Sequence, residues 1–318
     1  MVWWHRLASV VSIGLMVWAS SAWAGDASPQ ALPNVLPTTE IAPGVFYHAG
    51  AQAEENRENG GDIANIGFIV GSRCVAVIDT GGSPAVGAAL RRAVEARTTT
   101  PICYVINTHM HPDHVLGNRA FVSDGTRFVG AAGLSRALAS RASTYLDRLS
   151  ESLDVHTDSS WIVLPDQTVS NQMTLDLGER TLRLRAWPTA HTDNDLTVFD
   201  EKTGTLWLGD LLFVDRVPSI DGSITGWQSA LDKLAARTDI VHAIPGHGPV
   251  DGRWPTVLDP EIRYLNAIEH GVREALDHGR GLRWAQDHVA QDERDRWLLF
   301  DEYNPRNVTA AYTELEWQ

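Results

Sequence analysis

The amino-acid sequence predicts a layered α/β protein in which helices cover the outer faces of the sheets. Three observations lead to this prediction. Short apolar runs of strand length recur along the chain, longer stretches with helical periodicity lie between them, and polar residues with glycine or proline follow several apolar runs. The 318 residues, 43% of them hydrophobic, suffice for one large core or two small domains and exclude a disordered protein.

The elements follow in chain order from residue 45, and no internal repeat or low-complexity tract interrupts them. Apolar and β-branched runs predict strands at residues 45–48, 66–70, 75–78, 102–107, 127–130, 174–177, 181–186, 196–199, 205–208 and 240–243. Helical periodicity predicts helices at residues 84–97, 134–153 and 227–237. From Asp259 onward the sequence is helical and strongly charged.

The first 24 residues have the pattern of an export signal. Arg6 precedes an apolar run, and small residues at positions 22 and 24 predict cleavage after Ala24 and a periplasmic location. The run after Arg6 is shorter than the roughly 20 residues that a membrane-spanning helix needs. No later segment is long and apolar enough to span, so no membrane association is expected after cleavage. We divide the rest into a Pro-rich lead at 25–40, a main domain at 41–258 and a helical C-terminal extension at 259–318 that packs on it.

The mature chain would be strongly acidic. The full chain has a formal net charge of −14, and removal of residues 1–24 takes away Arg6 but no acidic residue. Nucleic acids bind proteins largely through Lys and Arg contacts to phosphates, and anionic membranes attract the same residues. The charge therefore makes nucleic acid an unfavourable partner, and it disfavours anionic membrane surfaces likewise.

The two cysteines, Cys74 and Cys103, each stand about five residues before a polar strand end, which is consistent with neighbouring strands. An oxidising compartment would permit a disulfide between them. Neighbouring parallel strands, however, give poor disulfide geometry, so buried free thiols are the favoured interpretation and the disulfide is the alternative.

The stretch Thr-His-Met-His-Pro-Asp-His at residues 108–114 concentrates metal-binding side chains behind a predicted strand. His109 and His111 are two residues apart in an extended segment, so they face the same point. Pro112 favours the first position of a helix, which turns Asp113 and His114 toward a second point nearby. The motif therefore predicts two pairs of ligands.

Two pairs do not complete two metal sites, so further His or carboxylate side chains must come from elsewhere, preferably from strand ends. Three candidates fit: His191 in "PTAHTDND", Asp210 in "LWLGD" and His247 in "IPGHG". A glycine or proline near each of them lets the backbone turn toward the ligand.

Together with "VIDTG" upstream, these motifs resemble the ordered motifs of the metallo-β-lactamase superfamily over roughly residues 41–249. The resemblance implies a four-layer αββα sandwich with a dinuclear zinc site in the cleft between the sheets. It also implies that Asp210 bridges the two ions and that Asp79 is an outer carboxylate orienting a ligand, although a plain turn residue is the alternative for Asp79. The implied ligands are His109, His111 and His191 for the first zinc, and Asp113, His114 and His247 for the second.

The implied activity is hydrolysis of a small-molecule ester, thioester or related bond by a hydroxide that bridges two zinc ions, with Asp113 and Asp210 as the catalytic carboxylates. Zinc β-lactamases typically have Cys or Ser where this chain has Asp210, so β-lactam hydrolysis is an alternative. An iron-dependent enzyme resembling the persulfide dioxygenases is another, because imidazole suits iron as well as zinc. A non-catalytic binding module is the third.

A narrower likeness is to the exported zinc metallohydrolases of quinoprotein relay systems. It rests on "NGGDIANIGFIVG" at residues 59–71 and "NVTAAYTELE" near the chain end. The likeness implies a periplasmic partner, either a quinoprotein dehydrogenase or a sulfur-oxidation protein. Residues 51–61 lie where the superfamily often has a substrate-covering loop, and an ordinary solvated hairpin loop is the alternative.

Overall fold

Two β-sheets form the centre of the protein. The computed structural model describes residues 1, 3, 32–123 and 125–317, so the predicted signal peptide lies outside the described residues apart from positions 1 and 3. One sheet has the strand order β1 (Thr39–Ala42), β2 (Val45–His48), β3 (Ile66–Val70), β4 (Val75–Ile78), β5 (Ile102–Ile106), β6 (Arg127–Ala131) and β7 (Gln167–Val169). The other has the order β12 (His242–His247), β11 (Thr205–Phe213), β10 (Leu196–Asp200), β9 (Thr181–Ala186) and β8 (Gln172–Asp176).

Both sheets are mixed. In the first, β1 to β4 are antiparallel neighbours, and β4 to β7 run parallel. In the second, only the pair β11 and β12 is parallel. The candidate metal-binding side chains of residues 109–114 follow the carboxyl end of β5, and His247 lies at the carboxyl end of β12.

Alternation along the strands determines which layer each side chain joins, because successive side chains point to opposite faces. In β4, Ala76 and Ile78 pack between the two sheets, whereas Val75 and Val77 pack against α1 (Pro84–Arg97). Ser83 caps α1 by accepting a hydrogen bond from the Val86 N–H. The α3 helix (Leu134–Leu153) packs with the segment that follows β5.

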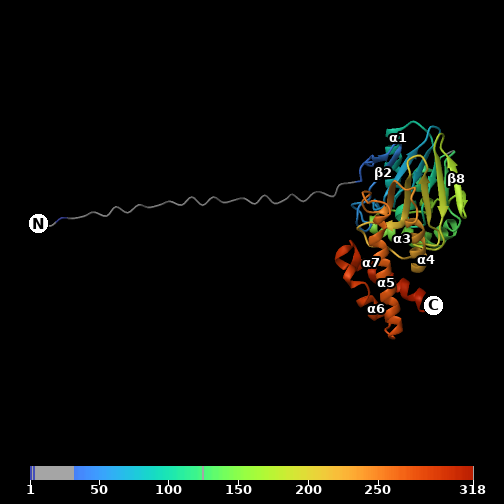
Figure 1. Cartoon of the computed structure of the whole chain (residues 1–318). Helices are drawn as coiled ribbons and strands as arrows, with labels where there is room; N and C mark the ends of the chain where they lie inside the picture. Colours follow the sequence, from blue (N-terminus) through green and yellow to red (C-terminus); the bar gives the residue numbers. More distant parts are fainter. Residues whose placement is uncertain (2, 4–31, 124, 318) are drawn as a thin grey trace.

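The α4 helix (Ile224–Ala235) shares one apolar core with residues of the second sheet, and α5 (Asp259–Asp277) and α7 (Phe300–Leu315) extend this core by packing on α4. Trp227, Leu231 and Tyr264 of these helices are fully buried, and each contributes on the order of 2 kcal/mol by burial. Figure 1 shows α5, α6 (Leu282–His288) and α7 gathered at one end of the sheets. Helices thus lie outside two packed sheets, which confirms the predicted α/β layers and C-terminal helices.

The predicted strand and helix positions hold through the first sheet, but β11 and β12 differ from the prediction. Both strands continue farther than expected, so Asp210 lies inside β11 and His247 is the last residue of β12. The Pro and Gly residues before His247 resemble a turn in sequence. The register between the two strands shifts at Gly209, opposite Pro245, and an irregular position of this kind tolerates proline within a strand. Strands β1 and β7 were not predicted.

The expectation of free thiols is wrong, because Cys74 and Cys103 form a disulfide. Strands β4 and β5 are parallel neighbours, but their register slips at the start: Val75 faces Ile102, whereas Ala76 faces Tyr104. Cys103 is therefore the extra residue of a bulge, which redirects its side chain. Cys74 precedes β4, and the two Cα atoms are 5.5 Å apart, within reach of a disulfide.

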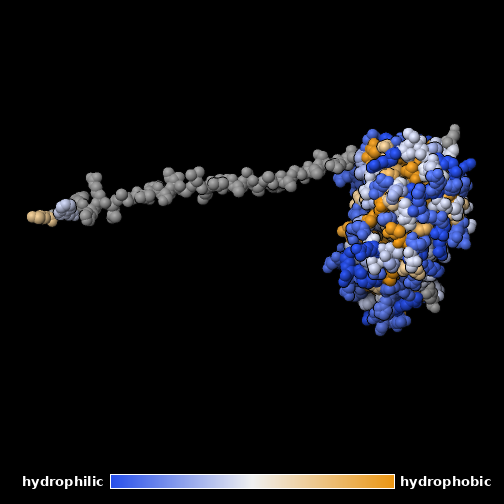
Figure 2. Space-filling model, turned by 45° about the horizontal axis from the view of Figure 1, so that its top comes forward, coloured by the Kyte–Doolittle hydropathy of each residue, from blue (hydrophilic) through white to orange (hydrophobic). Residues whose placement is uncertain are grey.

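The visible surface is mainly hydrophilic, with hydrophobic residues scattered between the polar ones (Figure 2). This agrees with the acidic composition. Among the residues described, none of the helices combines the length and apolarity that a membrane span requires.

We predict that loss of the Cys74–Cys103 disulfide destabilises the protein. The bond closes a loop with a sequence separation of 29, so its removal should lower the free energy of unfolding by about 2–4 kcal/mol. Denaturant unfolding with and without a reductant measures this, and a C74A/C103A double variant, which should not respond to the reductant, is the control. Two titratable thiols in the oxidised, unfolded protein would contradict the disulfide.

Candidate metal centre

The metal-binding motif lies where β5 leaves the first sheet. His111 precedes the one-turn helix α2 (Pro112–Val115), and Pro112 begins this helix because its fixed φ angle suits the first helical position. The structure divides the motif into two groups, as the spacing predicted. His109 and His111 lie in one group, and Asp113 and His114 lie in the other.

The first group has three histidines with ring nitrogens directed at one point. His111 Nδ1 lies 3.0 Å from His109 Nε2 and 3.0 Å from His191 Nε2. His191 comes from the loop between β9 and β10, so two chain segments 80 residues apart meet here. Three converging nitrogen atoms can occupy three positions of a tetrahedral metal ion and leave one open.

The second group consists of Asp113, His114 and His247. Asp113 Oδ2 lies 3.2 Å from His247 Nε2 and 3.6 Å from His114 Nε2. His247 reaches this position because β12 pairs in parallel with β11 and ends beside the motif.

Asp210 lies between the two groups. Its Oδ1 atom is 3.1 Å from His114 Nε2, and its Oδ2 atom is 3.4 Å from His247 Nε2. The same Oδ2 atom is 3.5 Å from His191 Nε2 and 3.6 Å from His109 Nε2. A carboxylate placed in this way can contact an ion in either group or in both.

The outward-facing nitrogen of each histidine has a partner, which leaves the other nitrogen for the centre. Two of these partners are carboxylates: His114 Nδ1 lies 2.8 Å from Asp79 Oδ2, and His111 Nε2 lies 3.2 Å from Asp221 Oδ2. The remaining three contacts are His191 Nδ1 to the Ser219 carbonyl at 2.6 Å, His247 Nδ1 to the Ile63 carbonyl at 2.8 Å, and His109 Nδ1 to the Thr108 hydroxyl at 3.0 Å.

Asp79 links two parts of the centre. In addition to its contact with His114, the Asp79 carboxylate accepts hydrogen bonds from the Thr108 N–H at 2.8 Å and from the Thr108 hydroxyl at 2.7 Å. Its backbone has a left-handed φ of 53°, a conformation that Asp and Asn adopt more readily than most residues. Asp79 therefore fixes both the ring of His114 and the backbone immediately before His109.

The chemistry of this centre fits a bound cation. His114 Nε2 and Asp210 Oδ1 are buried, and neither forms a hydrogen bond although they are 3.1 Å apart. Unpartnered buried polar atoms are costly, and a divalent ion would satisfy both. Burial opposes ionisation of Asp210, yet His114, His247 and His109 hold its pKa well below the usual value. Burial, reinforced by His111, lowers the pKa of His191 to about 3, so it is neutral, as a metal ligand must be.

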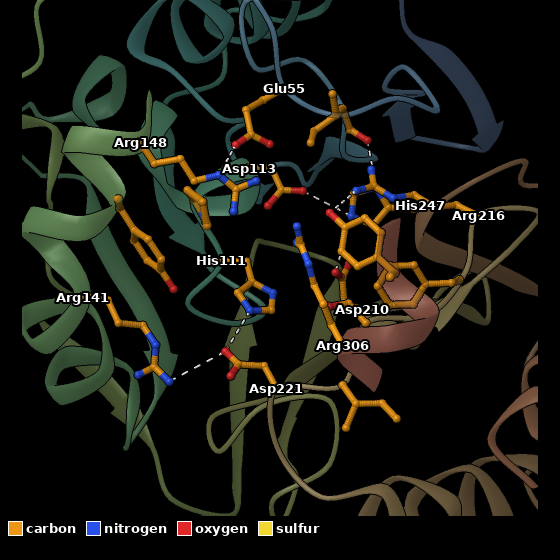
Figure 3. Close-up of a pocket in the computed structure, with 17 residues that line it drawn as sticks. Glu55, His111, Asp113, Arg141, Arg148, Asp210, Arg216, Asp221, His247 and Arg306 are labelled. Atoms are coloured by element: carbon orange, nitrogen blue, oxygen red, sulfur yellow. Dashed lines mark hydrogen bonds and ion pairs between the residues drawn. The ribbon is translucent and has the colours of Figure 1, made fainter. Parts of the chain in front are cut away.

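Members of both groups, His111, Asp113, Asp210 and His247, line a cleft of about 290 Å³ (Figure 3). Ile63, Phe213 and Ile220 give one part of the wall an apolar character. Arginines are prominent elsewhere in the wall: Arg141 and Arg148 come from α3, Arg216 from the segment after β11 and Arg306 from α7. The sequence motifs did not single out any of these arginines, because they are dispersed through the chain.

The sequence motifs did not single out residues 218–222 either, although this segment supports two of the three histidines of the first group, His191 through Ser219 and His111 through Asp221. Asn307 of α7 holds this segment: its side chain accepts from the Ile220 N–H at 2.9 Å and donates to the Pro218 carbonyl at 2.6 Å. A C-terminal helix thus positions a loop that orients candidate ligands. No sequence pattern connects positions so far apart.

The loop at residues 51–61 connects β2 to β3 and lines the cleft through Glu55. Glu55 pairs with Arg148 of α3 at 2.5 Å. Glu54 accepts a hydrogen bond from the Tyr303 hydroxyl of α7 at 2.6 Å and pairs with Arg216 at 3.2 Å. The loop is therefore a hairpin connection that also contacts two walls of the cleft, through Glu55 on one side and Glu54 on the other.

Three histidines outside the motifs, His48, His156 and His242, take no part in the two metal-binding groups. Both ring nitrogens of His48 are occupied, one by the Pro37 carbonyl at 2.8 Å and the other by Asp62 at 2.9 Å. Among the described residues, the groups with metal-ligand geometry contain neither this histidine nor His156 nor His242.

Comparisons with known proteins give a family and a fold. The sequence profile of the metallo-beta-lactamase superfamily matches residues 59–247. A metallo-beta-lactamase from Pontibacter korlensis is 19% identical, with a TM-score of 0.58 over 73% of this chain and 99% of that chain. The metallo-beta-lactamase IND-7 is 16% identical, with a TM-score of 0.56 over 72% of this chain and 97% of that one. No curated protein matches the chain.

A stereoselective inverting sec-alkylsulfatase, Pisa1 from Pseudomonas sp., is also similar. It is 16% identical, with a TM-score of 0.69 over 88% of this chain and 50% of that chain. The similarity covers a larger fraction of this chain than residues 1–258 could supply, so it includes part of the C-terminal helices. At such identities, all three structures are informative about the fold alone.

We predict that Asp79→Asn weakens metal binding by about 10- to 100-fold, because residues that orient metal ligands typically have effects of this size. Asn tolerates the left-handed backbone but cannot accept three hydrogen bonds as a carboxylate does. Titration of the metal-free protein with zinc measures the affinity. Asp154→Asn is the control, since Asp154 has the same φ of 53° and is exposed. Equal zinc affinities in wild type and Asp79→Asn would refute the role of Asp79.

Proposed function

The chain belongs to the metallo-β-lactamase superfamily, and on this basis we propose that it is an exported, zinc-dependent hydrolase of a small-molecule ester, thioester or related bond. One observation carries the proposal. Seven His and Asp side chains converge in two groups, four of them line a cleft, and two buried polar atoms of the seven are unpartnered. A binding module without catalysis would not need this complete ligand set beside an open cleft.

The residues of the proposed active site have distinct tasks. Five imidazoles and two carboxylates would hold two ions, with Asp210 shared between them. Two zinc ions bound there would polarise the scissile group and make a water acidic enough to attack at neutral pH. Asp113 and Asp210 line the cleft and can orient the attacking water by accepting its hydrogen bonds. The apolar wall formed by Ile63, Phe213 and Ile220 would exclude other water from the bound substrate.

Zinc is proposed over iron because both ligand groups have at least three members, which favours a dinuclear hydrolytic centre. If iron occupied one of the two ligand groups, the enzyme would instead be suited to oxidation of a persulfide. This iron-dependent oxidation is the competing function. Asp210 favours an ester or thioester over a β-lactam as substrate, because zinc β-lactamases typically have Cys or Ser at the corresponding position.

We also propose a periplasmic location, with cleavage after Ala24. The export pattern of residues 1–24 supports it, and so does the Cys74–Cys103 disulfide, because such bonds persist mainly in oxidising compartments. The sequence likeness to metallohydrolases of quinoprotein relay systems supports a periplasmic quinoprotein or sulfur-oxidation protein as a functional partner.

We predict that Asp210→Asn leaves the fold intact but lowers turnover by on the order of a hundredfold, because the change removes the shared charge of the centre. A hydrolysis screen of the zinc-loaded protein over thioesters, lactones, β-lactams, sulfate esters and phosphodiesters identifies the substrate for this measurement.

Asp215→Asn is the matched control for this variant. Asp215 is an exposed carboxylate in the same chain segment, so its loss should leave turnover unchanged. Full activity and unchanged zinc content in Asp210→Asn would contradict the proposed role. Oxygen-dependent turnover of a persulfide by the iron-loaded form, without hydrolysis by the zinc form, would favour the competing function.

A further inference from the structure

Four arginines line the cleft, but they differ in what they contact. Arg141 lies 3.7 Å from Asp221, Arg148 lies 2.5 Å from Glu55, and Arg216 lies 3.2 Å from Glu54. Each of these three guanidinium groups is thus at least partly neutralised by a carboxylate of the protein. They contribute to the wall of the cleft and to the attachment of the loop at residues 51–61.

Arg306 differs from the other three. No carboxylate of the described residues lies within ion-pair distance of it. Its guanidinium carbon lies over the ring of Tyr303, 5.3 Å from the ring centroid. Figure 3 shows its side chain reaching from α7 into the cleft toward Asp113 and His111. An arginine of this kind has its hydrogen-bond donors available to a bound molecule.

The position of Arg306 is set by its neighbours on α7. Asn307 fixes the helix to residues 218–222 through two hydrogen bonds, and Tyr303 is attached to Glu54 of the loop. Stacking on Tyr303, three residues earlier on the helix, directs the guanidinium group toward the cleft. The backbone that carries Arg306 is therefore fixed relative to the metal-binding groups.

The local charge favours an anion even though the protein as a whole is acidic. Two divalent ions would outweigh the charges of Asp113 and Asp210, and the unpaired Arg306 would add a further positive charge. A positive cleft in a negative surface attracts small anions in preference to polyanions. The volume of about 290 Å³ suits a small molecule, and Ile63, Phe213 and Ile220 suit its apolar part.

We propose that Arg306, from the C-terminal extension, binds an oxyanion of the substrate, so that the substrate is a small ester or thioester bearing a carboxylate or sulfate next to an apolar part. The guanidinium fork matches the geometry of either group through paired hydrogen bonds. The inference rests on the proposed hydrolytic function and specifies its substrate class. It also assigns the C-terminal extension a role in specificity.

Calorimetric titration of the zinc-loaded full chain with succinate and, separately, with sulfate tests this without any turnover. Arg306→Gln should weaken binding of at least one anion by about 10- to 100-fold, because hydrogen bonds to charged groups have effects of this size. The anion that loses more affinity identifies the group that is recognised. Arg306→Lys keeps the charge but not the fork, so it should retain part of the affinity.

Arg283→Gln is the matched control, because Arg283 is 86% exposed on α6 and does not line the cleft, and it should bind both anions as wild type does. Arg306 is itself exposed, so the melting temperature of Arg306→Gln should equal that of wild type. Equal anion affinities in wild type and Arg306→Gln, or no binding of either anion to wild type, would overturn the proposal.

A kinetic arm separates this inference from the proposed function. Arg306→Gln should raise KM for the anionic para-nitrophenyl hemisuccinate and leave KM for neutral para-nitrophenyl acetate unchanged. If Arg306→Gln binds the anion more weakly than wild type does, but wild type hydrolyses no substrate, the anion site is retained and the proposed hydrolase function is refuted. An equal rise in KM for both esters would count against recognition of the anion.

Discussion

The structure depends on the placement of two carboxylates, the buried Asp210 and the partly buried Asp113, among five imidazole rings. Burial of charge is costly unless the charge is compensated, and the described part of the chain leaves Asp210 Oδ1 and His114 Nε2 without hydrogen bonds. A bound cation would offset this cost and would stabilise only the folded state. The strands and helices around the centre therefore have to hold the ligands in position while leaving these atoms available.

Several features of the fold meet this requirement. The first sheet supplies the motif after β5, and Asp79 at the end of β4 orients it. The second sheet supplies Asp210 and His247 from adjacent parallel strands whose register shifts near Gly209. The C-terminal helices complete the arrangement, since Asn307 holds the loop that orients the first group. The extension is thus part of the candidate site as well as part of the packing.

The sequence predicted what depends on local geometry. Period-two alternation and the proline before Asp113 were sufficient to divide the motif into two groups, and apolar runs located most strands. Contacts formed through space were not predictable. Asp221 meets His111 across 110 positions, and Arg306 reaches the cleft only because α7 packs beside it. The disulfide depends on a shift in register between β4 and β5, and no pattern of residues in the sequence predicts this shift. The continuation of β12 through Pro245 likewise depends on an irregularity in its partner strand.

Anomalous X-ray diffraction from crystals of the mature protein tests the central claim most directly, because it locates and identifies metal atoms without reference to any substrate. Data collected on both sides of the zinc and iron absorption edges should give two zinc peaks. One should lie among His109, His111 and His191, and the other among Asp113, His114 and His247, with Asp210 between them. A single peak, a peak that appears only at the iron edge, or zinc bound outside these two groups would contradict the account.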